Sequence, residues 1–145
     1  MTARSSLNLD SGTYYSGLAF EDDDIFYTNN LGFAKIEKWS LADKEKKLIS
    51  TNNLSGGASS IGLIGDILGG TQTTSCFSMN KNLTGPIAIH TIDECAVTGE
   101  ILAKYLAFLG TVGDNFIVVF SAATEYYLDY GAWFLRRYDS SFNQV

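Results

Sequence analysis

Three segments of the chain share one short pattern of apolar and acidic residues. In each segment an aliphatic residue is followed, after two positions, by a large apolar residue and then by Ser or Asp, and a polar turn comes next. Successive segments lie 53 and 46 residues apart, and the three sets are Ile36–Trp39–Ser40, Ile89–Ile92–Asp93 and Leu135–Tyr138–Asp139. Repetition at such spacing indicates that one small structural unit recurs along the chain.

A second similarity lies upstream of the first and third segments. Residues 17–30 and 105–121 each contain Leu-Ala-Phe, then an acidic turn, then β-branched and aromatic residues. Between them, residues 61–79 have the Gly-rich sequence of a hairpin and a short apolar strand, although the glycines also suit a flexible surface loop. We interpret the chain as a single β-rich domain, 1–145, with three units at 14–50, 55–100 and 101–145.

Composition supports strands and tight turns. Aromatic residues make up 13% of the chain, which has 14 Gly and one Pro. Aromatic and β-branched residues fit a pleated surface, and Gly supplies the turns. With 46% apolar and 18% charged residues, the composition is that of a globular protein.

The repeated units resemble the blades of β-propellers, in which a strand of the form Ile-x-x-Trp/Ile/Tyr-Ser/Asp leads into a turn before the next blade. The resemblance covers most of the chain from Gly17 onward, although the Trp-Asp and kelch Gly-Gly signatures are absent in register. It implies an all-β fold of short antiparallel strands in propeller-like blades.

A β-sandwich or jelly roll is the alternative, because any alternating antiparallel strands give similar patterns. One segment within that alternative fits a helix near residues 100–109, with Gly110 as its C-cap. The apolar residues on one face of this helix would be Ile101, Leu102, Tyr105, Leu106 and Leu109.

A chain of only three blades is expected to need partner chains. Propellers close with about four to eight blades, so three blades would leave sheet edges open, and open edges pair readily with another chain. We therefore expect a non-enzymatic structural or interaction module that assembles with itself or with other protein subunits. Small acidic β-rich chains of this composition are frequent among virion and tail-appendage components.

No catalytic signature occurs in the sequence. The single histidine, His90, has no nucleophile motif near it, and Thr71 stands where a P-loop would need Lys. The four carboxylates of residues 21–24 lack the spacing of a calcium loop and suit a solvated hairpin tip. Cys76 and Cys95 match no zinc pattern and are expected as free thiols. No enzyme activity, metal or cofactor is predicted.

Aromatic residues cluster near the C-terminus beside two arginines, the residue types that dominate interface hot spots. They also suit sugar rings, so a carbohydrate-binding propeller is the alternative function. The predicted interface or ligand platform consists of Trp39, Tyr126, Tyr127, Tyr130, Trp133, Arg136, Arg137 and Tyr138.

Net charge and hydropathy exclude other partners. A formal charge of −6 provides no basic surface for nucleic acid. The longest apolar runs fall far short of the ~20 residues that cross a bilayer, so no membrane span is predicted and a soluble protein is expected. The first ten residues lack the apolar region of a signal peptide. The location stays open, with a virion as one candidate.

Overall fold

The computed structural model describes residues 15–29, 34–42, 47–54, 57–72, 75–91, 103–123 and 132–145. This part of the chain contains eleven β-strands and no α-helix, which confirms the all-β prediction. The strands are β1 (Tyr15–Glu21), β2 (Asp24–Asn29), β3 (Lys35–Ser40), β4 (Lys47–Asn53), β5 (Ala58–Ile64), β6 (Ile67–Gln72), β7 (Ser75–Asn80), β8 (Ala88–Thr91), β9 (Ala103–Val112), β10 (Asn115–Ala123) and β11 (Ala132–Tyr138).

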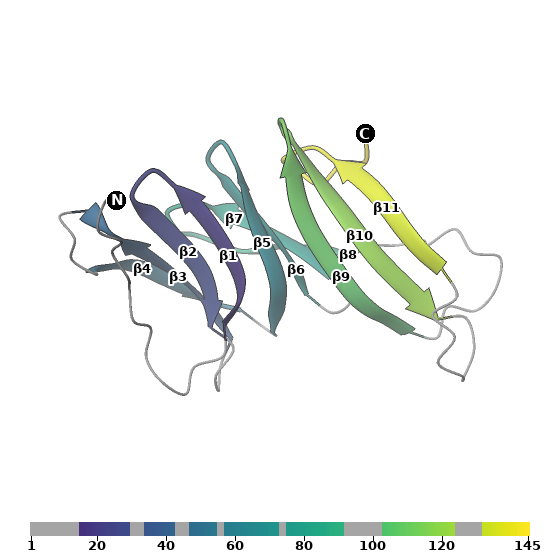
Figure 1. Cartoon of the computed structure of the whole chain (residues 1–145), viewed down its shortest axis with the longest axis horizontal. Coiled ribbons are helices and arrows are strands. Elements are labelled where there is room, and N and C mark those ends of the chain that lie inside the picture. The colour runs from purple at the N-terminus through teal and green to yellow at the C-terminus, as the bar shows by residue number, and fades with distance from the viewer. Residues whose placement is uncertain are drawn as a thin grey trace, which may run out of the picture.

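The strands form three antiparallel sheets that follow one another along the chain. The first sheet has the order β1-β2-β3-β4, the middle sheet β5-β6-β7-β8, and the third sheet β11-β10-β9. Figure 1 shows them side by side in an open row, with the first strand of each sheet near that of the next. Propeller-like and sandwich arrangements are both compatible with these sheets. The single domain and its three repeat units stay a prediction.

Each sheet begins with a hairpin closed by a two-residue turn. The first residue of each turn has positive φ: Asp22 (51°), Gly65 (54°) and Gly113 (57°). An Asp follows it each time, as expected for the turn that matches the twist of a hairpin. The four carboxylates of residues 21–24 therefore surround a hairpin tip, as predicted. All three turns lie along the same edge of the row, at the top of Figure 1.

The helix proposed near residues 100–109 is wrong, because residues 103–112 form β9. This strand pairs with β10 from Ala103 opposite Ala123 to Val112 opposite Asn115. Its apolar residues satisfy a helical period and a strand equally well, so the pairing partner decides between them. The β-branched and aromatic strand β10 supplies that partner.

Two further expectations need correction. The repeated short pattern does not mark equivalent strands. Ile36 and Leu135 lie in β3 and β11, the third strand of their sheets in chain order, whereas Ile89 lies in β8, the fourth strand of the middle sheet. The Gly-rich segment forms the hairpin β5–β6 rather than a flexible surface loop. Its Gly69 and Gly70 are buried, since aromatic rings of neighbouring strands occupy the space above them.

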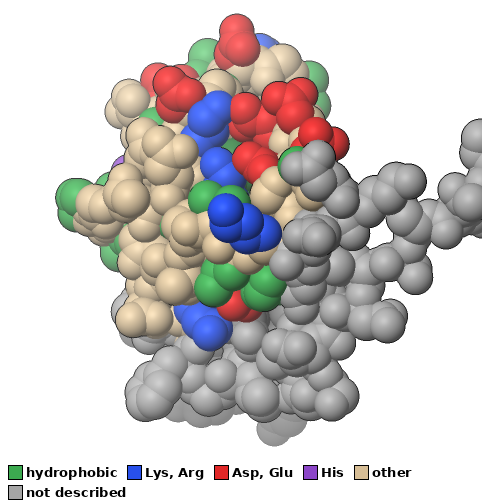
Figure 2. Space-filling view, turned by 90° about the vertical axis from the view of Figure 1, so that its left-hand side faces the viewer, with side chains coloured by type: hydrophobic (Ala, Val, Ile, Leu, Met, Phe, Trp, Pro, Cys, Tyr) green, Lys and Arg blue, Asp and Glu red, His purple; other side chains and the backbone are tan. Residues whose placement is uncertain are grey.

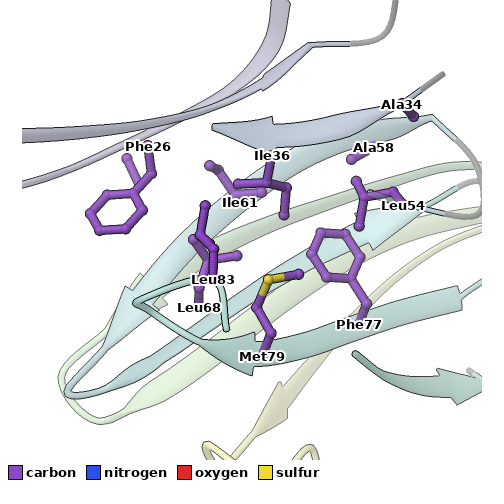
Figure 3. Packing of buried hydrophobic residues seen from close by; sticks show 11 residues of the cluster. Phe26, Ala34, Ile36, Leu54, Ala58, Ile61, Leu68, Phe77, Met79 and Leu83 are labelled. Atoms are coloured by element: carbon purple, nitrogen blue, oxygen red, sulfur yellow. The ribbon is translucent and has the colours of Figure 1, made fainter. Parts of the chain in front are cut away.

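Two apolar clusters hold the three sheets together. In the first cluster Phe26 and Ile36 of the first sheet pack with Leu68 and Phe77 of the middle sheet (Figure 3). The second cluster joins the middle and third sheets, and its members are Cys76, Leu109, Phe116, Val118 and Tyr138, with Ile64, Ile67 and Phe142 against them. Each sheet thus contributes a face to a core shared with its neighbour.

Candidate functional site: the inner strands and two open sheet faces

The first strands of the three sheets, β1, β5 and β9, line a shallow cavity. Its volume is about 230 Å³. The lining residues are Leu18, Ala19, Phe20, Ile61, Gly62, Leu63, Gly110 and Thr111. None of these side chains titrates between pH 2 and 12, so the cavity offers shape and backbone groups rather than acid–base chemistry.

Residues that line the cavity or lie next to it, as Leu109 does, occupy equivalent positions in the three sheets. Each hairpin turn follows one residue of the inner strand: Glu21, Ile64 or Val112. Counting back three positions from these residues reaches a large aliphatic side chain in every sheet: Leu18, Ile61 and Leu109. Counting back two positions reaches a small residue in every sheet: Ala19, Gly62 and Gly110. The large and small residues point to opposite faces, because side chains alternate along a strand.

Within the row, the large residue of one sheet packs on small residues of the sheet before it. Ile61 lies over Gly17, where an added Cβ would be 3.3 Å from its Cγ1. Leu109 lies over Gly62, where an added Cβ would be only 2.9 Å from its Cδ2. Ile61 and Leu109 are consequently 6% and 8% exposed.

The two ends of the row lack such a contact within the described part of the chain. Leu18 has the same position as Ile61 and Leu109 but is 57% exposed. A Cβ added at Gly110, the equivalent of Gly62, would meet nothing within 4 Å. The first sheet therefore presents a large residue, Leu18, that packs on no glycine among the described residues. The third sheet presents a glycine, Gly110, that no described large side chain covers.

Both ends of the row carry exposed apolar side chains. The pairing of β1 with β2 places Leu18, Phe20, Ile25 and Tyr27 on the outer face of the first sheet. Leu18 and Phe20 are exposed there, whereas Tyr27, which stacks on Trp39, is 2% exposed. The outer face of the third sheet, defined by Gly110, Val112, Ile117, Val119 and Leu135, follows from the pairing of β10 with β9 and β11. Four of these residues are exposed large hydrophobics, namely Leu18, Phe20, Val112 and Leu135.

Charged residues gather at the turn end of the molecule. Acidic side chains are concentrated at the upper end of the first-sheet side (Figure 2), where Asp22 and Asp23 form the exposed tip of the first hairpin. Lys81 bridges two sheets there, since its Nζ lies 2.6 Å from Glu21 Oε1 and 3.3 Å from Asp66 Oδ1. The hydrogen bond with Glu21 raises the pKa of Lys81.

The only histidine belongs to the junction between the middle and third sheets. His90 Nε2 lies 2.8 Å from Ser78 Oγ, and its ring stacks on Phe142 with centroids 4.7 Å apart. Partial burial lowers the pKa of His90. Phe142 also stacks on Phe116, at 4.9 Å. His90 thus helps to seat the C-terminal segment on the two sheets.

The C-terminal segment is held in place by one carboxylate. Asp139 Oδ1 accepts hydrogen bonds from the backbone N–H groups of Ser141 and Asn143, each at 2.9 Å. These bonds, the one from Asn143 foremost, lower the pKa of Asp139. Phe142 lies inside this loop with φ of 60°. The carboxylate therefore fixes the turn that aims Phe142 at its neighbours.

The predicted platform residues do not form one surface. Trp39 lies in the first sheet and stacks on Tyr27, with centroids 6.3 Å apart, whereas the other described members lie in β11 of the third sheet. Arg137 is exposed and donates from Nε to Asn115 Oδ1 at 2.6 Å. Tyr138 is buried against Phe142. The side chains of Tyr126, Tyr127, Tyr130 and Trp133 lie outside the described part, and their predicted role stays a prediction.

Metal-binding clusters and bilayer-spanning helices are absent from the described ranges. These ranges contain no group of three or more His, Cys, Asp or Glu residues that could hold a metal ion. Cys76 is buried there. The same ranges include no helix with the length and hydropathy needed to traverse a bilayer. The equivalence of Leu18, Ile61 and Leu109 was not predicted from the sequence. It depends on the distance of each residue from its hairpin turn, and the sequences around the three residues are not alike.

Comparison with known proteins concerns the fold alone. No protein-family model and no curated protein matches the chain. Among solved structures it is similar to a chain in the crystal structure of a nidogen/laminin complex, with a TM-score of 0.58 and 16% identity. The match covers 92% of this chain and 47% of the chain in the complex, so the protein spans less than half the length of that chain.

A second solved structure is that of the computationally designed Ika4 protein. It matches with a TM-score of 0.49 and 13% identity, over 100% of this chain and 78% of that chain. This TM-score is too low to establish a shared fold. The first match is compatible with a propeller-like arrangement of the three sheets, and no comparison assigns a family.

Proposed function

We propose that the protein is a non-enzymatic interaction module that works by assembly through its two outer faces. The observation that carries the proposal is the exposure of Leu18 and Phe20 on one end of the row and of Val112 and Leu135 on the other. Contiguous exposed apolar side chains on a sheet are typical of surfaces that another protein covers. Burial of such side chains is the main driving force of association.

Two further observations support a role without catalysis. The cavity along the inner strands is lined by side chains that do not titrate in the physiological range. His90, the single histidine, is engaged by Ser78 and Phe142 at a junction between sheets. The solved chain that this protein resembles comes from a complex between two proteins, which favours a protein as the partner.

The molar mass in solution tests this proposal. Size-exclusion chromatography with light scattering at micromolar concentration should give a mass above the 15.8 kDa of the single chain. The mass should fall toward that of one chain on dilution, since association follows mass action. A monomer at every concentration measured would contradict assembly of this chain with itself.

A place in a virion or tail appendage is the specific setting that we propose. The support is compositional: the chain is small, acidic with a net charge of −6, and rich in Gly and aromatic residues. Mass spectrometry of purified particles should then find the chain at a fixed ratio to the other structural proteins. Its presence only in the particle-free fraction would exclude this setting.

Carbohydrate binding is the second candidate, and one contact favours it. Trp39 is partly exposed and stacks on Tyr27, the arrangement of a flat platform that receives a sugar ring. A glycan array should show binding that is lost on Trp39→Ala while the circular dichroism spectrum is retained. Trp133→Ala provides the matched test on the third sheet. Binding unaffected by both substitutions, or no binding at all, would exclude this function.

A further inference from the structure

We infer that the partner on these faces is a second copy of this chain, and that two copies close a ring of six sheets. In this ring Leu18 of each copy packs on Gly110 of the other, so that the outer face of one first sheet covers the outer face of the other third sheet. The inference rests on the proposed function and deepens it by naming the partner and the contact.

The contact between Leu109 and Gly62 provides the template for the missing one. Leu109 packs there on a glycine two positions before the end of β5, in the sheet before it. Ile61 also packs on a glycine of the sheet before it, but this residue, Gly17, lies four positions before the end of β1. Leu18 has the position of Leu109, and Gly110 lies two positions before the end of β9, as Gly62 does in β5. A second copy of the chain supplies each of these two residues to the other.

The open faces also match beyond this pair. Ile25 has the position of Leu68 and Phe116, which follow the hairpin turn by the same number of residues and are fully buried on the preceding sheet. Ile117 of the third sheet has the position of Gly69, on which Phe116 lies. An aliphatic Ile25 is smaller than Phe116 and therefore suits the larger Ile117 beneath it.

The number of copies follows from the limits on ring closure. Propellers close with about four to eight blades, so one chain has too few sheets and three chains would have too many. Two chains give six sheets, which lies within this range. The arrangement is head to tail, and the rotation that relates the copies closes it without a free end.

Charge favours the head-to-tail order over a contact between identical faces. Opposite charges lie on the same edge of the row at its two ends. Asp22 and Asp23 form the turn of the first hairpin, and the exposed Arg137 pairs with Ile117 close to the turn of the third hairpin. Joining unlike faces brings the arginine of one copy, together with the single turn carboxylate Asp114, toward the acidic tip of the other. Joining two first sheets would instead bring two acidic tips together.

Arginine substitutions at the two ends test the inference by complementation. Leu18→Arg and Gly110→Arg should each reduce the mass of the full chain from twice 15.8 kDa to 15.8 kDa at the same micromolar concentration. Gly110 tolerates a side chain in the single chain, because the space around its Cβ position is empty and its φ is not positive. The matched control is Ile89→Arg, at a residue 51% exposed on the middle sheet, which should leave the dimer unchanged.

An equimolar mixture of the Leu18→Arg chain with a Gly110→Glu chain should recover a dimer. The native Leu18 of the second chain packs on the native Gly110 of the first. At the other interface the introduced arginine and glutamate meet with opposite charge. Circular dichroism of each variant alone establishes that it folds. If a variant does not fold, Leu18→Ala and Gly110→Ala replace it, with a rise of at least about tenfold in the dissociation constant expected for Leu18→Ala.

Other outcomes overturn the inference and leave the proposed function in place. A dimer disrupted by Leu18→Arg but not by Gly110→Arg would show that two first sheets meet. Failure of the mixture to recover a dimer, or a native assembly larger than two chains, would exclude the ring of six sheets. A native chain that is monomeric at all concentrations would instead contradict both the inference and the self-assembly on which it rests.

Discussion

Packing between the middle and third sheets predicts a large effect from a single added methyl group. A Cβ at Gly69 would lie 2.7 Å from Phe116 Cζ and 3.0 Å from both Cε atoms. Carbon atoms pack best at about 3.5–4.0 Å, so the ring would need to move by about 1 Å. Phe116 is fully buried and stacks on Phe142, which leaves it no room to retreat.

Gly69→Ala should therefore destabilise the fold even though alanine lowers the entropy of the unfolded chain. Overpacking costs about 1–3 kcal/mol, and the entropy effect offsets about 0.4–1 kcal/mol of it. A net loss of about 1–2 kcal/mol would lower the melting temperature by roughly 2–8 °C in a chain of this length. Urea denaturation and thermal melting followed by circular dichroism measure both quantities.

Phe116→Leu supplies the control, because the three atoms nearest to a Cβ at Gly69 all belong to the Phe116 ring. In that background Gly69→Ala should cost little, and the double-mutant cycle should give a coupling of about 1 kcal/mol or more. A Gly69→Ala protein as stable as the native chain, or additive effects of the two substitutions, would refute the close packing of these sheets.

Three further predictions concern the same junctions. Burial lowers the folded-state pKa of His90 below its ordinary 6.5. The contribution of the neutral histidine to the free energy of unfolding should therefore be complete above pH 6.5 and decline as the pH falls toward the folded-state pKa. Urea midpoints measured against pH should show this decline, and His90→Gln should remove it. Phe142→Ala should cost roughly 1.5–2.5 kcal/mol in urea denaturation, about half the loss for a fully buried Phe, whereas Val145→Ala at the exposed terminus should have no effect. Lys81→Met should lower the melting temperature at low salt and not at about 1 M salt, and an equal loss at both would argue against its ion pairs.

The sequence by itself determined the secondary structure class and the local turns. Alternating aromatic and β-branched residues, separated by Gly and Asp, specify strands and hairpins within a few residues of one another. The acidic tip at residues 21–24 and the Gly65 turn could be predicted for this reason, since each depends only on neighbours in the chain. The exclusions of nucleic acid and of a membrane span, which stay predictions, also came from composition alone.

Tertiary structure decided which strands are equivalent and which residues meet. Ala103–Val112 fits a helix or a strand, and only pairing with β10 selects the strand. The short pattern around Ile36, Ile89 and Leu135 matched strands that are not equivalent in the three sheets. Similar residue patterns recur in any strand whose apolar and polar residues alternate. The relation of Leu18 to Gly110 became visible only after counting from the turns of paired strands. Packing between sheets joins residues far apart in the chain, so neither local propensity nor periodicity records it.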